Sequence, residues 1–511
     1  MFSHIFRFEL AFHSRQPLLY VVSLVIFILS FGATTSDNIQ MGGVITNINI
    51  NSPYNVVSML SSVSFIVSLI AGVAYASGAV LRDFDHKIAE LFFTTRVNKF
   101  NYLMGRFCGA VTFCFIVYFI AALGVFLGEF MPWIDPDRLG PMRLDAYWFV
   151  TWAIAIPNII MISALVFMIA TLTRSLLISY VVLISVLVLS SVITSLVDPE
   201  DIQLLSMLDP FGTVALTEVT RYWTPFEMNE LLVVMEGNLL INRLLVVALT
   251  LIFGAAAYHF FPFSMDFSRK KKSWLSRLRR TKNLPEKESP LLKGAIPEEV
   301  SVHQRFDFSG QISQFLSLAR IEFHNIIIGK AFIMMALLGM MQIALGAFFN
   351  LAGMFGTEVY PTTAAIMLII NGSYSIPLIA VLVFYSSELF VRERNVGISE
   401  IVDSMPHSNG VVILAKLAGL MSVIAAMLLA AMVAGILVQT FKGYFEYEFS
   451  QYLFGLFSFF QFPIWFTCVL AVFAQALTGN RYIGMFVVVA FFVGNMFLPQ
   501  IGYNHNLYLF A

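Results

Sequence analysis

The chain has 511 residues, of which 59% are hydrophobic and only 12% are charged, and its formal net charge is −1. Soluble domains usually carry about twice that share of charged residues, so this composition excludes a soluble globular enzyme and a disordered chain. The apolar segments are long and continuous, which predicts an all-α protein that crosses a membrane several times.

Eleven apolar runs are each long enough to cross a bilayer as a helix, which takes about 20 residues. The first six lie at about 16–35, 55–81, 107–128, 147–172, 176–197 and 243–264. The other five lie at about 331–350, 362–387, 412–438, 453–478 and 482–499. The first run is expected to be a span and not a cleaved signal peptide, because no clear small-residue cleavage site follows it.

Lys and Arg residues predict the orientation, because the cytoplasmic segments of membrane proteins are enriched in them. With the N-terminus inside, the inside segments hold 25 Lys and Arg residues and the outside segments hold five. Many of the inside residues lie in 265–310, a basic segment that contains three prolines and reads as a cytoplasmic linker.

The sequence on either side of this linker matches itself without a gap at an offset of 310 residues. Arg82-Asp83 matches Arg392-Glu393, Ile88 matches Ile398, Glu90 matches Glu400, Leu91 matches Ile401, Thr94 matches Ser404, Arg106 matches Lys416 and Gly109 matches Gly419. Upstream, Arg7 and Glu9 match Arg320 and Glu322, each pair just before the first span of its half. We therefore predict two tandem six-helix units in the same orientation, at 1–264 and 311–511.

The second unit shows only five spans before Ala511. We expect its last helix, the twelfth of the pair of units, to be missing from this chain. The alternative is that this helix has been lost or is supplied by another chain.

The segment 388–416 predicts a short amphipathic helix outside the bilayer that ends at Ser404-Met405-Pro406. Glu393 and Glu400 would lie two turns apart on one face of it. Such a helix can lie in a groove of a soluble partner, or it can rest on the lipid surface. The presence of a copy at the equivalent place in each unit favours docking to a partner.

The pattern Arg392-Glu393-Arg394-x-x-Gly397-x-x-Glu400-Ile401-x-x-Ser404-x-Pro406 resembles the loop between spans two and three of ABC-2 type transporter permeases. In that family the loop is a coupling helix that touches the nucleotide-binding ATPase. The resemblance implies the same role for Arg82, Asp83, Glu90 and Leu91, although Lys87 stands at the position of the Gly and Arg96 at that of the Pro.

Two further features extend this resemblance. The segments around Arg7 and Glu9 and around Arg320 and Glu322 resemble the amphipathic connecting helix that precedes span one in the family. The fusion of two units resembles the membrane half of bacterial proteins that join an ABC-2 permease to an M1 aminopeptidase-like domain.

The resemblance implies the membrane subunit of an ATP-driven exporter in the bacterial cytoplasmic membrane, paired with two copies of a separate ATPase. The chain has no G-x-x-x-x-G-K-[ST] phosphate loop, so ATP and Mg are expected on that partner and no cofactor on this chain. We expect no catalytic residue, no metal site and no nucleic-acid partner. Two alternatives stay open: a membrane scaffold for an appended M1 peptidase-like domain, and an ion-coupled secondary carrier. Carriers generally need ionisable residues within the membrane, and the runs up to 197 contain none.

Small polar residues on spans two and five are candidates for the lining of a transport pathway, because these spans border the pathway in ABC-2 permeases. The candidates are Ser61, Ser64, Ser68, Ser185, Asn371, Ser373 and Tyr374. The alternative is close helix packing. A lining rich in Phe, Met and Leu favours an amphipathic cargo over an ion.

The segment 198–242 is the longest on the outside. Asp209-Pro210-Phe211-Gly212 and Trp223-Thr224-Pro225 predict turns that flank short helices. These helices would either cap the exit of a pathway or anchor the chain at the membrane interface.

Overall fold

In the computed structural model, residues 1–35, 47–85, 88–195, 202–261, 307–350, 359–405, 407–459 and 462–497 are described. This part of the chain is helical with connecting turns and contains no strand. Eight of its helices are long and apolar enough to cross a membrane, or nine if the bent pair Phe2–Ser14 and Leu19–Thr35 forms one span. The prediction of a helical membrane protein with several spans is confirmed.

The first half contains α1 to α13. The helices that form its bundle are α1 (Phe2–Ser14), α2 (Pro17–Thr35), α3 (Pro53–Ala71), the π-helical η1 (Gly72–Ser77), α4 (Gly78–Asp85), α5 (Ala89–Phe93), α6 (Lys99–Gly128), α7 (Leu144–Val150), the π-helical η3 (Thr151–Ala155), α8 (Ile156–Thr173) and α13 (Gly237–Phe260). The turn η2 (Pro136–Arg138) precedes α7, and α9 (Leu176–Ser195) leads to α10 (Ile202–Leu208), α11 (Thr213–Thr220) and α12 (Pro225–Glu230).

The second half begins after the linker. Residues 262–306, which include most of the linker, lie outside the described residues, as do 498–511 at the end of the chain. Its helices are α15 (Phe308–Ile327), α16 (Lys330–Asn350), α17 (Thr363–Ser373), α18 (Ser375–Val396), α19 (Ser399–Asp403), α20 (Asn409–Phe441), α21 (Phe449–Phe454), the π-helical η4 (Gly455–Phe459), α22 (Phe462–Thr478) and α23 (Arg481–Phe497).

Side-chain caps fix where several of the long helices begin. The hydroxyls of Ser52, Thr362 and Ser408 each accept a hydrogen bond from a backbone N–H in the first turn of α3, α17 and α20. These N–H groups have no partner within a helix, so a capping oxygen stabilises the start of the helix.

The fourth expected span of each half contains a π-helical stretch just before a proline. The stretch Thr151–Ala155 precedes Pro157, and Gly455–Phe459 precedes Pro463. Proline has no N–H and its ring clashes with the carbonyl four residues earlier, so the wider π turn lets the helix continue past it. The two halves therefore share a local distortion.

The run 362–387, which the sequence predicts as one span, is not one continuous helix. The structure divides it at Tyr374 into α17 and α18. Pro377 cannot donate a hydrogen bond to the carbonyl of Ser373, and Gly372 weakens the preceding turn, so the helical hydrogen bonds are interrupted here.

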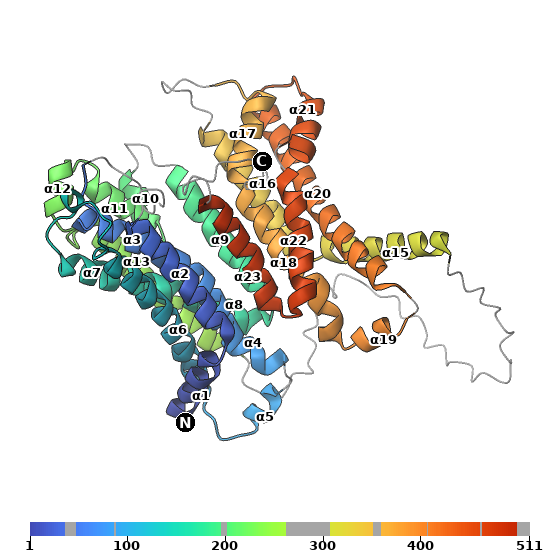
Figure 1. The fold of residues 1–511 in the computed structure, drawn as a ribbon, viewed down its shortest axis with the longest axis horizontal. Coiled ribbons are helices and arrows are strands. Elements are labelled where there is room, and N and C mark those ends of the chain that lie inside the picture. The colour runs from blue at the N-terminus through green and yellow to red at the C-terminus, as the bar shows by residue number, and fades with distance from the viewer. Residues whose placement is uncertain are drawn as a thin grey trace.

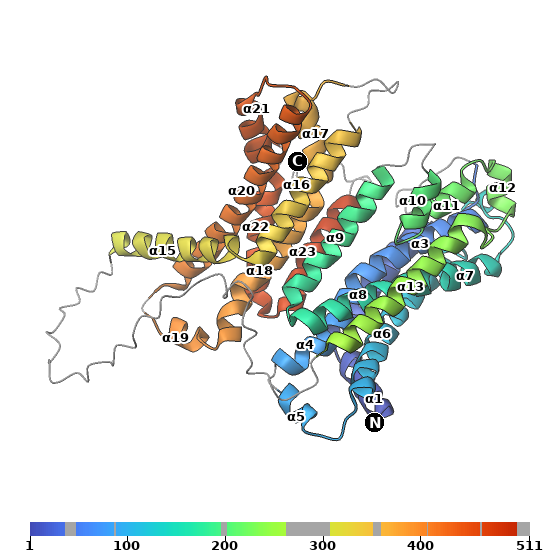
Figure 2. The same ribbon diagram turned by 180° about the vertical axis from the view of Figure 1, so that it is seen from behind.

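The helices form two bundles, one from each half, and α9 and α23 lie between them (Figures 1 and 2). Although α9 belongs to the first half, Val181, Ile184 and Val188 on it share a buried cluster with residues of the second half. The ring centroids of Tyr180 on α9 and Phe384 on α18 are 3.9 Å apart. The fifth helix of the first unit therefore joins the two bundles.

The turns predicted in 198–242 are confirmed: they separate α10, α11 and α12. Asn242 on α13 donates hydrogen bonds to the backbone carbonyls of Ser206 and Asp209, at 2.8 Å each. Arg243, which is buried, donates to Asn158 on α8 at 2.9 Å. This polar network fastens the short helices to the bundle, and its buried arginine was not predicted.

Candidate functional site

The candidate site consists of two segments that we call the first elbow (82–96) and the second elbow (392–406). Each runs from the end of expected span two through a short helix toward span three. The short helices α5 (Ala89–Phe93) and α19 (Ser399–Asp403) have the same bounds shifted by 310 residues, as do the starts of α6 and α20. Both elbows lie at the same end of the molecule (Figures 1 and 2). Residues 86, 87 and 406 lie outside the described residues, and with them the expected role of Pro406.

The prediction of one amphipathic helix in 388–416 is wrong. Arg392, Glu393 and Arg394 lie in the last two turns of α18, which is capped by Gly397 with a φ of +77°. Glycine adopts this left-handed conformation without the clash that a Cβ causes, and it ends helices for that reason. Glu400 lies on the separate α19. The two glutamates therefore do not share a helix face.

Buried charges tie the first elbow to the helix at the N-terminus. Arg82 and Arg106 both form ion pairs with Glu9, which is fully buried. Arg106 also lies 2.5 Å from Asp83, and Tyr102 donates a hydrogen bond to the same Asp83 carboxylate at 2.6 Å. Arg106 thus bridges two carboxylates, one on α1 and one on α4.

The carboxyl of Glu9 is held in its charged form. Burial by itself raises its pKa, but a hydrogen bond from His13 and the charges of Arg106 and Arg82 outweigh this effect and keep the pKa below its ordinary value. His13 Nε2 lies 3.2 Å from the Glu9 carboxylate. The negative charge of Glu9 is therefore balanced by Arg82 and Arg106 within the protein.

The second elbow repeats these contacts in a weaker form. Arg392 lies 3.3 Å from Glu322, and Lys416 lies 3.1 Å from Glu393. Arg392 and Glu393 stand at the positions of Arg82 and Asp83, Lys416 at that of Arg106, and Glu322 at that of Glu9. A lysine is a single point charge, whereas the forked guanidinium of Arg106 contacts two carboxylates at once.

Glu322 differs from Glu9 in its pKa. Burial raises the pKa of Glu322, and the attraction of Arg392 and Lys416 offsets this only in part, while the charge of Glu393 raises it further. The second cluster therefore holds its buried carboxylate less firmly in the charged form.

The matched glycines allow the helices to approach closely. A Cβ at Gly109 would lie 2.4 Å from the Cβ of Glu9, and one at Gly419 would lie 2.9 Å from the Cβ of Glu322. No side chain fits at either point. In each half, span three thus touches the helix before span one at the buried glutamate.

The outer surface of both elbows carries matched apolar side chains. Leu91 is 71% exposed and Ile401 is 60% exposed, and Ile88 and Ile398 are exposed beside them. A cluster of exposed apolar side chains is typical of a surface that contacts a partner protein or lipid.

The expected site residues therefore separate into two groups. Arg82, Asp83, Arg392, Glu393, Glu9 and Glu322 form ion pairs within the chain, whereas Leu91, Arg394, Gly397, Glu400, Ile401, Arg7 and Arg320 are exposed. The backbone of Glu90 lies on α5, but its side chain is outside the described part. Sequence reasoning missed Tyr102 and His13, because their roles depend on the packing of α1 against α6.

The pathway candidates of the first half's span two are buried. Ser61, Ser64 and Ser68 lie on α3, and the hydroxyls of Ser64 and Ser68 donate to the carbonyls of Ser61 and Ser64. The hydroxyls of Ser64 and Ser68 are thus satisfied within their own helix, as expected of residues at a helix-packing face. Ser185 lies partly buried on α9, between the two bundles.

The candidates of the second half lie around the break between α17 and α18. Tyr374 is fully buried and donates a hydrogen bond to the carbonyl of Met427 at 2.9 Å. Asn371 is exposed, and the side chain of Ser373 is outside the described part. Tyr374 therefore fixes α18 to α20.

Comparisons with protein-family models, with curated proteins and with solved structures found no match to this chain. Within the described ranges, no group of three or more His, Cys, Asp and Glu side chains could hold a metal ion.

Proposed function

We propose that the chain is the membrane-spanning subunit of an ATP-driven exporter in the bacterial cytoplasmic membrane. Two ABC-2-like permease units would cross the membrane eleven times in this chain, with the N-terminus in the cytoplasm. Two copies of a separate ATPase, which hold ATP and Mg, would bind at the two elbows. The cargo would be amphipathic.

The observation that carries the proposal is the pair of matched elbows. Two segments 310 residues apart form the same short helix, lie at the same end of the molecule and expose matched apolar residues, Leu91 and Ile401. A lone amphipathic segment is explained by contact with lipid. Two equivalent copies suit a partner that binds twice.

The ion pairs supply a route for motion. A displacement of α5 or α19 by a bound partner would be transmitted to the end of span two, because each elbow continues directly from that span. Arg82 and Arg392 would pass this motion to α1 and α15, and Arg106 and Lys416 to span three. ATP-driven closure of the partner would thus move several helices of each bundle together.

The test is recovery of ATPase activity with the tagged protein from native membranes. Leu91→Asp and Ile401→Asp place a charge at the tip of each elbow. We expect each variant to lower the co-purified, vanadate-sensitive ATP hydrolysis, and the double variant to remove most of it. Glu400→Arg, which reverses an exposed charge on the second elbow, should act in the same direction.

Ile312→Asp is the matched control, because Ile312 is also exposed but lies on α15, outside the elbows. ATP hydrolysis that is absent from the wild-type preparation would favour a scaffold without a motor. Hydrolysis that is unchanged in the double variant would show that the ATPase does not bind at the elbows.

A further inference from the structure

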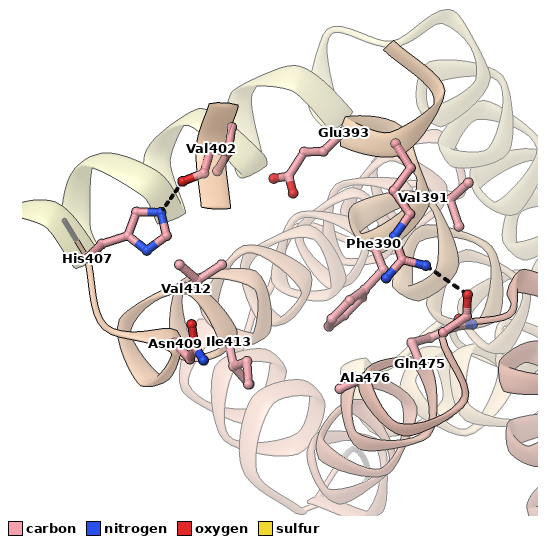
Figure 3. A pocket seen from close by; sticks show the side chains of 12 residues that line it. Phe390, Val391, Glu393, Val402, His407, Asn409, Val412, Ile413, Gln475 and Ala476 are labelled. Atoms are coloured by element: carbon pink, nitrogen blue, oxygen red, sulfur yellow. Dashed lines mark hydrogen bonds between the residues drawn. The ribbon is translucent and has the colours of Figure 1, made fainter. Parts of the chain in front are cut away.

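A pocket of 360 Å³ lies beneath the second elbow, between the ends of four helices (Figure 3). Its walls come from the end of α18, from α19, from the start of α20 and from the end of α22. The lining residues are Phe390, Val391, Glu393, Arg394, Val402, His407, Asn409, Val412, Ile413, Gln475, Ala476 and Gly479.

In the first half, aromatic rings gather at the matched positions. Phe84 stands at the position of Arg394, and Tyr102 at that of Val412. Phe261 packs against both rings, with centroids 6.4 Å from Phe84 and 6.1 Å from Tyr102. At these two positions the second half carries a charged residue and a smaller one in place of aromatic rings.

Two buried polar atoms of the pocket lining have no hydrogen-bond partner among the described residues. One is Nε2 of Gln475, whose side chain is 2% exposed, and the other is Nδ1 of His407. Nε2 of His407 donates to the carbonyl of Val402 at 2.9 Å. Buried polar groups are nearly always satisfied, so an unpaired amide donor beside a pocket indicates that a polar ligand enters it.

The other polar groups of the lining are mainly donors or positive. Arg394 uses one of its five N–H groups to bind the carbonyl of Gly479 at 2.9 Å. Asn409 opens α20, a helix of 33 residues whose N-terminus carries partial positive charge. Among the described lining residues Glu393 alone has a carboxylate, and Lys416 holds it at 3.1 Å. Arg394, the Gln475 amide and the start of α20 together suit an anion with several oxygens.

We propose that this pocket binds the phosphate of a phospholipid headgroup. Its position favours a lipid over a soluble phosphate, because α18, α20 and α22 all belong to helices long and apolar enough to cross the membrane. Phe390 and Val412 supply apolar walls, and Ile413, which is 41% exposed, leads from the pocket to the apolar surface of α20. An acyl chain can follow this surface while the headgroup stays in the pocket.

The test measures binding of short-chain lipids to the purified protein in detergent by calorimetry. Dioctanoyl phosphatidylglycerol should bind, and dioctanoylglycerol, which has the same chains and no phosphate, should not. Arg394→Phe installs the residue of the matched first-half position and should weaken binding by at least about tenfold, through loss of a charge-assisted hydrogen bond. His407→Val, which installs the residue at position 97, should also weaken binding.

Arg15→Phe is the control, because it removes an exposed arginine from the first half and should leave binding unchanged. Equal binding by the wild type and both pocket variants would overturn the proposal, and so would equal binding of the phosphate-free lipid. If inorganic phosphate displaces the lipid at equal concentration, the ligand is a soluble anion and the assignment to lipid is wrong. The measurement needs no ATPase, so its result is independent of the proposed function.

Discussion

At the scale of single residues, the two halves use the same charges with unequal strength. Arg106 holds both Glu9 and Asp83, while Lys416 at the matched position lies beside Glu393. Removing one member of a buried ion pair leaves the other charge unpaired, so the loss of stability depends on how strongly the remaining charge was paired. The first elbow should therefore be the more rigid of the two.

Glu9→Gln and Glu322→Gln test this inequality. At pH 7, Glu9→Gln should cost about 3–5 kcal/mol because it removes the charge that pairs with both Arg82 and Arg106, and Glu322→Gln should cost less. The two variants remove the same charge from equivalent helices, so each is the control for the other. The midpoint of thermal unfolding in detergent measures the effect, and equal losses would contradict the inequality.

The pH dependence of the two carboxylates should have opposite signs. The pKa of Glu9 is lowered in the folded protein, so its contribution to stability is present above its ordinary pKa of 4.5 and is lost as the pH falls through the folded value. The pKa of Glu322 is raised, so its contribution grows as the pH falls through the folded value toward 4.5. The difference between the two variants should therefore shrink when unfolding is repeated at lower pH.

At the scale of elements, Gly397 separates α18 from α19. The motif predicted the importance of this glycine, but not that it ends a helix. The glycine divides the segment into the end of a span and a separate short helix. The elbow therefore has a fixed part, which carries the ion pairs, and a projecting part, which carries Ile401.

Gly397→Ala should destabilise the second elbow by about 1 kcal/mol, because alanine is strained in the left-handed conformation. A Cβ at Gly397 would meet no atom within 4 Å, so the cost comes from the backbone alone. Gly410→Ala is the control, since that site is equally open and its φ is not positive. We expect proteolysis between α18 and α19 to be faster in Gly397→Ala and unchanged in Gly410→Ala. Equal rates in both variants would show that the φ of Gly397 is unimportant.

At the scale of the whole molecule, α9 crosses from its own half to the other bundle. Tyr180 packs on Phe384 and also lies near Met485 of α23, with its hydroxyl 3.9 Å from the sulfur. If a protease site is introduced into the linker 265–310 and the chain is cleaved there, we therefore expect the two halves to stay associated.

Tyr180→Ala should weaken the association of the cut halves, because an aromatic pair contributes about 0.5–1.5 kcal/mol beyond the area that it buries. Phe130→Ala is the control, since Phe130, two residues after α6, pairs with Phe126 of the same half. Pull-down of the second half by a tag on the first measures the association. Halves that separate in the wild type would show that the linker is what holds the bundles together.

The sequence by itself determined the helical membrane class and the places at which the two halves match. Long apolar runs leave the backbone no alternative in lipid but to satisfy its hydrogen bonds within a helix. The matched glycines at 109 and 419 were also visible in the sequence, although the pattern did not show what they touch. The elbow segments contain both charged and apolar residues. Their spacing predicted that these residues lie on one helix, and this prediction is wrong.

Only the tertiary structure decided which of these residues are exposed and which are paired. Asp83 and Arg82 are charged residues of a kind usually found on a surface. The packing of α1 against α6 brings Glu9 to Arg82 and Arg106, so that Glu9 and Asp83 are buried and the Arg82 side chain is only 11% exposed. The same is true of the pocket beneath the second elbow, whose walls come from helices far apart in the sequence. Local patterns fix hydrogen bonding within a helix, whereas burial and charge pairing depend on what lies beside it.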